Sequence, residues 1–592
     1  MRLLTERDEQ LAALSKKYKR IFSGKWSRYA WGNFVTLTGD QLFDSIRSAI
    51  ENLQELPDLS ETGRLLFRRA TLKIYDRPTL RAVIQSIHEM DLTEHDGADI
   101  KGDMYEYLLS KISMSGTNGQ FRTPRHIIDF IVEVVDPKPD RRICDPACGT
   151  AGFLISSFNH ILKQNTSKAD LKTGNVTGDK LKPAQWKFLE QQAFTGFDND
   201  ANMIKIAILN LYLHKLEKAN IDLHNPLTTT RGGTYPGPQY DCILANPPFS
   251  GKVQKESILS DLNHGLNTRA TELLFLKWFI DHLADGGRAG VIVPDGIVAT
   301  VNKAYNQLRK MLLENFLYAV VSLPAGVFNP YSGVKTSILL MDKTLAKKTD
   351  EILFIQVENT GYDLGATRRP IKGNQLPLAS ELLKKYKNVV TEHSRLNATI
   401  ENSSIAHLVK KTTIAESGDY TLIGERYKHE LIYRNIKFKV VELGDMLVQK
   451  NERQKHSEFE VWSVSNQQGF VPSRDYFNKK IPSENTDNYK IIKPNYFAYN
   501  PSRINVGSIA VNKSSKTGIV SPMYVVFAIS DAKKLDRDFL YLNLKSDFGI
   551  KQIIAKSHGA VRKILRFNDL KTIKIPLPSL DVQKAIIAET DK

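Results

Sequence analysis

The chain contains few cysteines and no long hydrophobic run. Cys144, Cys148 and Cys242 are the only cysteines among its 592 residues, which excludes a disulfide framework and indicates a reducing compartment. No stretch of about 18 or more apolar residues occurs, and the first residues lack the apolar core of a signal peptide. We therefore expect a cytoplasmic protein without a membrane association.

Sequence signatures of several common ligands are also missing. Cys144 and Cys148 are not accompanied by a second pair of cysteines or histidines, so no metal site is predicted. The glycines of "DPACGTAGF" follow the spacing Gly149-x-x-Gly152 rather than Gly-x-Gly-x-x-Gly, and no Walker lysine accompanies them. This turn is therefore poorly suited to a dinucleotide or to the phosphates of ATP.

Basic residues, in contrast, are in excess. The formal net charge is +17 at pH 7, and residues 401–592 contribute ten of these charges, with 31 lysines and arginines against 21 aspartates and glutamates. Such an excess indicates a polyanionic partner, because a basic surface attracts phosphates. The alternative is a basic surface that serves only solubility, but the uneven distribution of the charge favours a partner.

Length and hydrophobic patterning predict a multidomain α/β protein. Segments such as "TGDQLFDSIRSAIENLQEL", with Thr38 and Asp40 as capping candidates, have apolar residues at helical spacing. The break "SGTNGQ" then indicates a domain boundary. The predicted parts are a helical N-terminal domain (1–115), an α/β domain (116–400), a linker (401–430), a mixed α/β domain (431–578) and the start of a C-terminal helix (579–592).

The α/β domain is predicted to hold a mostly parallel sheet with helices on both faces, because apolar strand candidates alternate with helical patterns. The polar stretch 164–186 is predicted to be an inserted loop. The strands are predicted over 141–145, 194–198, 240–245, 288–294, 318–324, 336–342 and 352–357. The helices are predicted over 124–135, 151–163, 199–217, 270–284 and 302–315.

Polar residues and glycines follow two of these strands. Asp145 ends the first strand before the glycine-rich turn, and a carboxylate there suits an amine-bearing ligand better than a phosphate. Asp198 ends the second strand, where acids of nucleoside-binding sheets accept hydrogen bonds from ribose hydroxyls. Asp200 is predicted to be the N-cap of the next helix instead.

The third strand ends in "ANPPF", and this turn predicts a cradle for an amine. An adenine exocyclic amine is a poor nucleophile, and two acceptors aimed at its N–H bonds would favour attack by its lone pair. The side-chain oxygen of Asn246 and the carbonyl of Pro247 can be these acceptors, held by two rigid prolines. Phe249 can stack on a base that has left its duplex. The alternative is a strand-ending turn whose phenylalanine belongs to the core.

The ordered motifs "FRTP" (121–124), "DPACGTAGFL" (145–154), "GFDND" (196–200) and "NPPF" (246–249) resemble those of the amino-methylating, gamma-class S-adenosylmethionine-dependent DNA methyltransferases. The helical N-terminus, "ATELLFLKWFIDHLADGGRAGVIVPDGI" and "LPAGVFNPYSGVKTSILLMDK" resemble the modification subunit of type I restriction-modification systems. The resemblance implies a Rossmann-like methyltransferase domain, S-adenosylmethionine as cofactor, and a prokaryotic cell.

The resemblance also implies a role for each matched position. The cofactor-binding residues would be Phe121, Thr123, Pro124, Asp145, Ala147, Gly149, Gly152 and Asp198. Thr123 and Pro124 would border its methionine moiety. The target adenine, methylated at N6, would be held by Asn246, Pro247, Pro248 and Phe249. Where the family has an acid against the cofactor adenine, this chain has Asn225, with Asp222 nearby, and this contact stays open.

The basic C-terminal region resembles a target-recognition domain of type I specificity subunits. The similarity lies in "ELGDMLVQKNER" and in "SHGAVRKILRFNDLKTIKIPLPSLDVQKAIIAE". Double-stranded DNA is the implied partner, and the predicted DNA-binding residues are Arg503, Lys513, Lys516, Lys556, Arg562, Lys563 and Arg566. Family members separate paired recognition domains with long helices. Only the first turns of such a helix follow Ser579, so we expect a shortened chain or a different mode of pairing.

These observations predict a site-specific DNA adenine-N6 methyltransferase of a restriction-modification or related phage-defence system. A second copy or a specificity-type subunit would pair through the C-terminal helix, and a separate subunit would supply any nuclease. Two alternatives are an RNA or protein-glutamine N-methyltransferase, and a DNA specificity module without catalysis. The recognition-like C-terminal domain disfavours the first, and the intact strand-end motifs disfavour the second.

Overall fold

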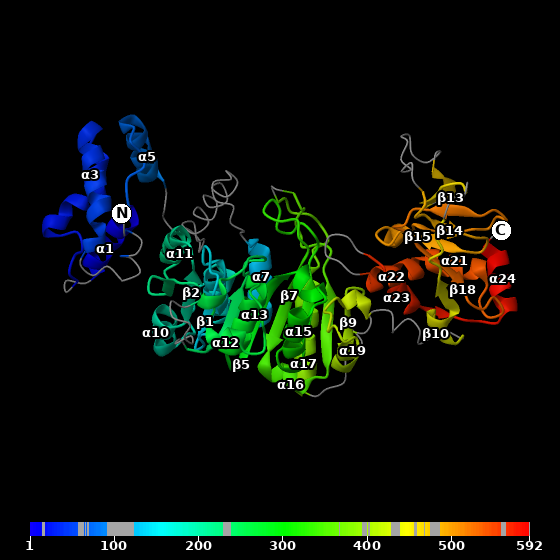
Figure 1. The fold of residues 1–592 in the computed structure, drawn as a ribbon. Helices are drawn as coiled ribbons and strands as arrows, with labels where there is room; N and C mark the ends of the chain where they lie inside the picture. The colour runs from blue at the N-terminus through cyan, green and yellow to red at the C-terminus, as the bar shows by residue number, and fades with distance from the viewer. Residues whose placement is uncertain are drawn as a thin grey trace. The chain divides into compact units, whose positions relative to one another are not determined.

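The computed structural model (Figure 1) describes residues 1–14, 18–56, 64, 67, 70–90, 123–228, 238–365, 368–392, 400, 403–427, 438–454, 459–466, 468–473, 486–557 and 564–590. These residues divide into two compact units. The first comprises Met1–Pro294 and Gln307–Thr412, and the second comprises Asp295–Asn306 and Thr413–Lys592.

The N-terminal part of the first unit is helical, as predicted. Its helices are α1 (Arg2–Leu14), η1 (Gly24–Tyr29), α2 (Trp31–Thr36), α3 (Gly39–Asn52), η2 (Leu53–Glu55) and α5 (Arg77–Glu89). Their core is rich in aromatic residues, including Trp31 and Phe34. Thr38 precedes α3 as predicted, but its side chain makes no capping hydrogen bond. The break predicted at 115–120 lies outside the described residues.

A nine-stranded sheet forms the centre of the first unit, in the order β3-β2-β1-β4-β5-β7-β6-β8-β9. The strands β3, β2, β1, β4 and β5 are parallel, β7 is antiparallel to both β5 and β6, and β9 is antiparallel to β8. The strands are β1 (Ile143–Asp145), β2 (Phe194–Asp198), β3 (Asn220–Leu223), β4 (Tyr240–Ala245), β5 (Leu283–Pro294), β6 (Leu317–Ser322), β7 (Thr336–Asp342), β8 (Glu351–Gln356) and β9 (Ala406–Lys410).

Helices cover this sheet (Figure 1). The buried side chains of α7, α8, α11 and α17 share one apolar cluster with alternate residues of the strands, such as Cys242 and Leu244 of β4. The helix α13 is apolar on nearly all sides and packs against β5. The bounds are α7 (Arg125–Val135), α8 (Gly152–Gln164), α9 (Lys168–Lys172), α10 (Pro183–Gln191), α11 (Ala201–Leu213), η3 (Lys255–Ser257), α12 (Ser260–Asn263), α13 (Thr271–His282), α15 (Lys303–Asn315), α16 (Lys343–Lys348) and α17 (Leu376–Glu392).

The structure departs from the sequence prediction at three places. The stretch 164–186 contains the short helix α9 and the start of α10, rather than only a loop. The 17-residue helix α17 was missed because its lysine-rich outer face dilutes its apolar pattern, although Leu382, Leu383 and Tyr386 are buried. The strand β9 lies in the range predicted as a linker and is held by pairing with β8.

The second unit has the mixed α/β character that was predicted. A four-stranded sheet, β11-β18-β15-β16, packs against helices around Phe497, Tyr499 and Phe527. The helix α14 belongs to this unit, where Leu422 N donates to Val298 O at 2.9 Å.

The helices of the second unit are α14 (Asp295–Ala299), α19 (Lys411–Glu416), which straddles the boundary at Thr412, η4 (Gly424–Arg426), η7 (Gly444–Met446), η8 (Ile504–Val506), α21 (Arg537–Lys545), α22 (Asp547–Lys556), α23 (Phe567–Lys571) and α24 (Leu580–Thr590). The strands are β10 (Val440–Glu442), β11 (Leu447–Gln449), β12 (Trp462–Ser465), β13 (Gly469–Pro472), β14 (Lys490–Ile492), β15 (Phe497–Tyr499), β16 (Ile509–Val511), β17 (Gly518–Val520), β18 (Val525–Ile529) and β19 (Lys574–Pro576). In the part of the chain that the structure describes, no helix is long and apolar enough to span a membrane.

Candidate active site

The carboxyl ends of three adjacent parallel strands bring the predicted motifs to one edge of the sheet. Strands β2, β1 and β4 are neighbours and end at Asp198, Asp145 and Ala245. Asn246 follows directly. Ligands of open α/β sheets bind outside the carboxyl ends of the strands, so this edge is the candidate site.

The loop after β1 is folded back against β2. Gly149 N donates to Asp198 Oδ2 at 3.0 Å, and Cys148 N donates to Phe197 O at 2.8 Å. The backbone of Gly149 is left-handed, with φ of 51°, and a Cβ there would meet no atom within 4 Å. The loop therefore needs glycine for its conformation, and it leaves open space beside the backbone for a ligand.

Gly152 has a different role in this loop. A Cβ at Gly152 would lie 2.9 Å from Cδ1 of Ile128. The missing side chain therefore allows α8 to approach α7 closely. The predicted contact of Gly152 with a cofactor stays a prediction, whereas its packing role follows from the geometry.

Two carboxyl groups give this edge its electrostatic character. Asp145 is 1% exposed, and burial raises the pKa of its carboxyl to about 8, helped by the charge of Asp198 and opposed by the N–H of Ala147. Burial also raises the pKa of Asp198, against hydrogen bonds from the N–H groups of Asp200 and Gly149. A ligand that brings a positive charge would favour the ionised form of both groups.

A cavity of about 450 Å³ adjoins these motifs. This volume lies within the usual range for a cofactor-sized ligand. Asn225 lines the cavity, and its Oδ1 accepts from Leu227 N at 3.1 Å. Asp222 is exposed on β3 and is not among the lining residues. The lining includes Pro146, Ala147, Asp198, Asn199, Asn225, Pro226, Leu227, Thr228, Pro248, Ser250 and Gly251.

Asn246 has one satisfied and one unsatisfied side-chain atom. Its Nδ2 donates to Oγ1 of Thr123 at 2.9 Å, while its Oδ1 is buried and accepts no hydrogen bond from a described residue. A buried acceptor without a partner costs about 1–3 kcal/mol, and such groups need a functional explanation. The atom that the sequence predicted to accept from an amine therefore has no hydrogen-bond partner in the part of the chain that the structure describes.

The two prolines and the phenylalanine after Asn246 differ in their exposure. Pro247 is buried, and the exposed Pro248 lines the cavity of about 450 Å³. Phe249 is partly buried, and its ring meets that of Phe328 edge-on, with centroids 5.8 Å apart and an interplanar angle of 86°. Phe328 comes from the loop between β6 and β7. Phe249 thus has an orientation fixed by the core while part of its ring stays accessible.

The first turn of α7 is fixed by residues that the sequence prediction missed. His126 Nε2 lies 3.2 Å from Oγ1 of Thr360, and its ring stacks on Tyr362 at 4.4 Å. Burial, followed by the charge of Arg368, lowers the pKa of His126 to about 4, so its ring is neutral at pH 7. These partners lie more than 230 positions away, and no local pattern could have predicted them.

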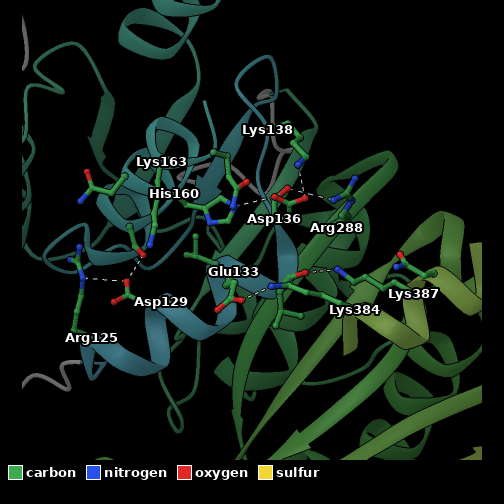
Figure 2. A pocket seen from close by; sticks show the side chains of 16 residues that line it. Arg125, Asp129, Glu133, Asp136, Lys138, His160, Lys163, Arg288, Lys384 and Lys387 are labelled. Atoms are coloured by element: carbon green, nitrogen blue, oxygen red, sulfur yellow. Dashed lines mark hydrogen bonds and ion pairs between the residues drawn. The ribbon is translucent and has the colours of Figure 1, made fainter. Parts of the chain in front are cut away.

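A second cavity, of about 880 Å³, lies along α7, α8 and α17 (Figure 2). Two of its cations cap the C-terminus of α7. Arg288 donates to the carbonyls of Val135, at 3.2 Å, and of Asp136, at 3.4 Å, and Lys387 donates to that of Val134. Cations at a helix C-terminus satisfy its last carbonyls and its dipole, so these residues have a structural role.

Other charged residues of the second cavity form ion pairs (Figure 2). Asp136 pairs with Lys138 at 2.5 Å and is hydrogen-bonded to His160 at 2.9 Å, and Glu133 pairs with Lys384 at 2.5 Å. Burial acts to raise the pKa of Asp136, but the hydrogen bonds from His160 and Lys138 outweigh it and hold the pKa below its usual range. These pairs tie α7 to its neighbours, and we assign no part of the chemistry to this cavity.

The predicted DNA-binding residues differ in their surroundings. Arg503, Lys516 and Arg566 are exposed, and Arg566 stands at the N-cap of α23, where its backbone N–H donates to Asp569 Oδ2 at 3.2 Å. Lys513 is paired with Asp538 at 2.9 Å. The pKa of Lys556 is lowered by burial and by neighbouring cations, which makes it a weaker candidate for a phosphate contact. Phe121, Arg562 and Lys563 lie outside the described residues.

The mixed sheet with its antiparallel β7, the acids at the ends of β1 and β2, and the Asn-Pro-Pro-Phe turn define a Rossmann-like methyltransferase. The family description "N-6 DNA Methylase" matches residues 96–432, and "Type I restriction modification DNA specificity domain" matches residues 435–589. The chain belongs to the N-6 DNA methylase family, and its C-terminal part carries the specificity domain. The resemblance found in the motifs is thereby confirmed.

Relatives and solved structures agree with this assignment. The type I restriction enzyme EcoEI methylase subunit from Escherichia coli is 33% identical over 341 residues, which cover 56% of this chain and 66% of that protein. The type I restriction enzyme EcoKI methylase subunit from Escherichia coli K12 is 28% identical over 374 residues, which cover 62% of this chain and 67% of that protein. This chain thus spans about two thirds of their length. A chain from a structure of a type I R-M system is similar with a TM-score of 0.56 and 25% identity, over 71% of this chain and 83% of that chain.

Proposed function

We propose that this chain is a site-specific, S-adenosylmethionine-dependent DNA adenine-N6 methyltransferase of a restriction-modification system, with its own target-recognition domain. The buried Oδ1 of Asn246, which accepts no hydrogen bond from a described residue, carries the proposal. It stands at the end of β4, next to the turn that lines the cavity of about 450 Å³. An acceptor in this position fits the exocyclic amine of an adenine that has left its duplex.

The residues present fit S-adenosylmethionine. The raised pKa values of Asp145 and Asp198 mark a place where a cationic ligand is favoured, and Gly149 leaves open space beside the backbone. Asp145 and the turn through Gly149 would hold the amino-acid end, and Asp198 the ribose. Asn225, which lines the cavity, is a better candidate than Asp222 for the adenine end. When bound, the cofactor supplies an electrophilic methyl group.

The residues of this chain would orient the amine and exclude water from it. Asn246 Oδ1 and the carbonyl of Pro247 accept the two hydrogens of the adenine N6, so that its lone pair points toward the cavity. Because these acceptors are preorganised, most of the orientation entropy is lost on binding rather than in the reaction. Phe249 offers the accessible part of its ring to the base, and aromatic stacking contributes about 1–3 kcal/mol per base.

The C-terminal unit would read the DNA sequence. The specificity-domain match over residues 435–589 supports this role, and so do the exposed cations of this region. The same proposal includes two partners. A second copy or a specificity-type subunit would pair through α24, and a separate subunit would supply any nuclease. α24 is anchored in its own unit by Gln583, whose side chain donates to the carbonyls of Lys534 and Pro578.

Transfer of tritiated methyl groups to unmethylated genomic DNA tests this proposal. We expect the full chain to form N6-methyladenine. Asn246→Ala should reduce the rate at least about a hundredfold, because a preorganised polar contact to the reacting group is lost, and should leave S-adenosylmethionine binding nearly unchanged. Methylation by Asn246→Ala at the wild-type rate would refute the cradle, and a product other than N6-methyladenine would refute the assigned reaction.

A further inference from the structure

The proposed cradle works only in one of the two orientations of the Asn246 amide. With Oδ1 toward the base, the side chain accepts a hydrogen from the adenine amine. With the amide flipped, Nδ2 would present its own hydrogens to the amine, and two donors would face each other. The cradle therefore also needs a partner that holds the other end of the amide in place.

Thr123 provides a partner for the other end of this amide. Asn246 Nδ2 donates to Thr123 Oγ1 at 2.9 Å, and Oδ1 has no hydrogen-bond partner among the described residues. We propose that Thr123 is a positioning residue that anchors the Asn246 side chain and leaves its Oδ1 for the target amine. A threonine hydroxyl can accept or donate, so it anchors the amide, and the hydrogens of the target amine select the orientation with Oδ1 toward them. The inference rests on the proposed function, and it concerns a contact within this chain rather than a contact with the cofactor.

Thr123 is itself held firmly enough for such a role. The following proline, Pro124, is buried and is the N-cap of α7, and a residue before proline is restricted to extended backbone. Ile127 and Ile131 anchor α7 in the core. The contacts of His126 with Thr360 and Tyr362 fix the same first turn. The backbone therefore holds the Thr123 side chain in place, while its O–H can still rotate.

This role differs from the one that the family resemblance implies for Thr123. The hydroxyl of Thr123 accepts from Asn246 Nδ2 at 2.9 Å, so the contact that the structure shows serves the cradle for the target amine. Loss of the hydroxyl should therefore impair methyl transfer without impairing cofactor binding.

The test compares Thr123→Val, which removes the hydroxyl at nearly constant shape, with Thr123→Ser, which keeps it. Thr391→Val is the matched control, since the hydroxyl of this exposed threonine on α17 donates to the carbonyl of Lys387 in its own helix. Each full-length variant is assayed for kcat on unmethylated genomic DNA and for the Kd of S-adenosylmethionine by calorimetry.

We expect Thr123→Val to lower kcat about ten- to a hundredfold, as for other small misplacements of catalytic groups. Its Kd should stay within about threefold, and Thr123→Ser and Thr391→Val should behave like wild type.

A Thr123→Val enzyme with wild-type kcat would overturn the inference while the proposed function stands. A loss of cofactor affinity that accounts for the whole loss of rate would also overturn it, because Thr123 would then act on the cofactor.

If the wild-type protein forms no N6-methyladenine, the proposed function fails, and a second measurement tests the contact between Thr123 and Asn246 alone. In protein labelled with ¹⁵N-asparagine, Asn246→Asp identifies the Asn246 side-chain signals. Thr123→Val should shift these signals and Thr123→Ser should not, and signals that are unmoved by Thr123→Val would contradict the contact.

Discussion

The backbone N–H of Gly149 donates to Oδ2 of Asp198 at 3.0 Å, and this bond joins the loops that follow two neighbouring strands. The same carboxylate accepts from Asp200 N at 2.9 Å through its other oxygen. Asp198 thus organises the floor of the candidate cofactor cavity before any ligand is present. The two glycines of this loop should consequently respond differently to substitution.

Gly149→Ala should weaken cofactor binding, and Gly152→Ala should weaken the fold. Alanine at Gly149 meets open space but must adopt φ of 51°, a strain of about 1–2 kcal/mol that shifts the loop. Alanine at Gly152 meets Ile128 at 2.9 Å, and overpacking costs about 1–3 kcal/mol. Calorimetric titration with S-adenosylmethionine should show the larger loss of cofactor affinity for Gly149→Ala, and thermal unfolding should show the larger loss of Tm for Gly152→Ala. A larger loss of affinity for Gly152→Ala, or a larger loss of Tm for Gly149→Ala, would contradict these roles.

Cofactor binding should release protons near neutral pH. The pKa of Asp145 is raised to about 8 by burial, so its carboxyl is mostly protonated at pH 7 and must ionise to pair with an ammonium group. The Kd of S-adenosylmethionine should then fall by up to about tenfold per pH unit between pH 6 and 7.5. Calorimetry in buffers of different ionisation enthalpy measures the proton release. Asp145→Asn should bind weakly and without this pH dependence, and a pH-independent wild-type Kd would contradict the role of Asp145.

The ion pairs around Asp136 should stabilise the fold rather than the reaction. His160 and Lys138 hold the pKa of Asp136 below its usual range, so the stabilisation is complete above pH 5 and is lost as the pH falls below about 4. Asp136→Asn should cost about 1 kcal/mol, since the pair is partly exposed, and lower the Tm of this large unit by about 1 °C at pH 7. Scanning calorimetry should show this difference shrink below pH 4, while methyl transfer at 25 °C stays near the wild-type rate.

Exposed cations of the C-terminal unit should set the salt dependence of DNA binding. Arg503 and Lys516 are exposed and form no ion pair with a described residue, whereas Lys513 is paired with Asp538. Arg503→Ala or Lys516→Ala should each reduce the slope of log K against log[salt] by about one. Lys513→Ala should change it less. Fluorescence anisotropy with an unmethylated duplex measures the slopes, and equal slopes for all variants would place the interface elsewhere.

Much of the fold could be predicted because its signals are local. Buried strands such as 240–245 and helices such as 201–213 have the right period and clear ends. The helix α17 escaped prediction because its apolar face alternates with lysines, and β9 because a short strand at a sheet edge is specified by its partner rather than by its own residues. Only for β9 was the missing information a long-range pairing, the one with β8.

The same distinction holds for the candidate site. Asn246, Asp145 and Asp198 were found because strand ends and prolines mark them in the sequence. The bond between Asn246 and Thr123, and the contacts of His126 with Thr360 and Tyr362, join segments 123 to 236 positions apart. Nor could the sequence show that Gly152 serves helix packing. The local sequence showed which motifs belong to the candidate site, but it could not show which atoms those motifs contact.

Mapping of modified bases tests the central claim most directly. DNA is sequenced from cells that express either the wild-type chain or Asn246→Ala, with detection of N6-methyladenine at single-base resolution. We predict methylated adenines within one recurrent sequence for the wild-type chain, and no such methylation for Asn246→Ala. A wild-type pattern without N6-methyladenine, or the same methylated sequence with Asn246→Ala, would contradict the assignment of Asn246 as the acceptor that selects the adenine amine.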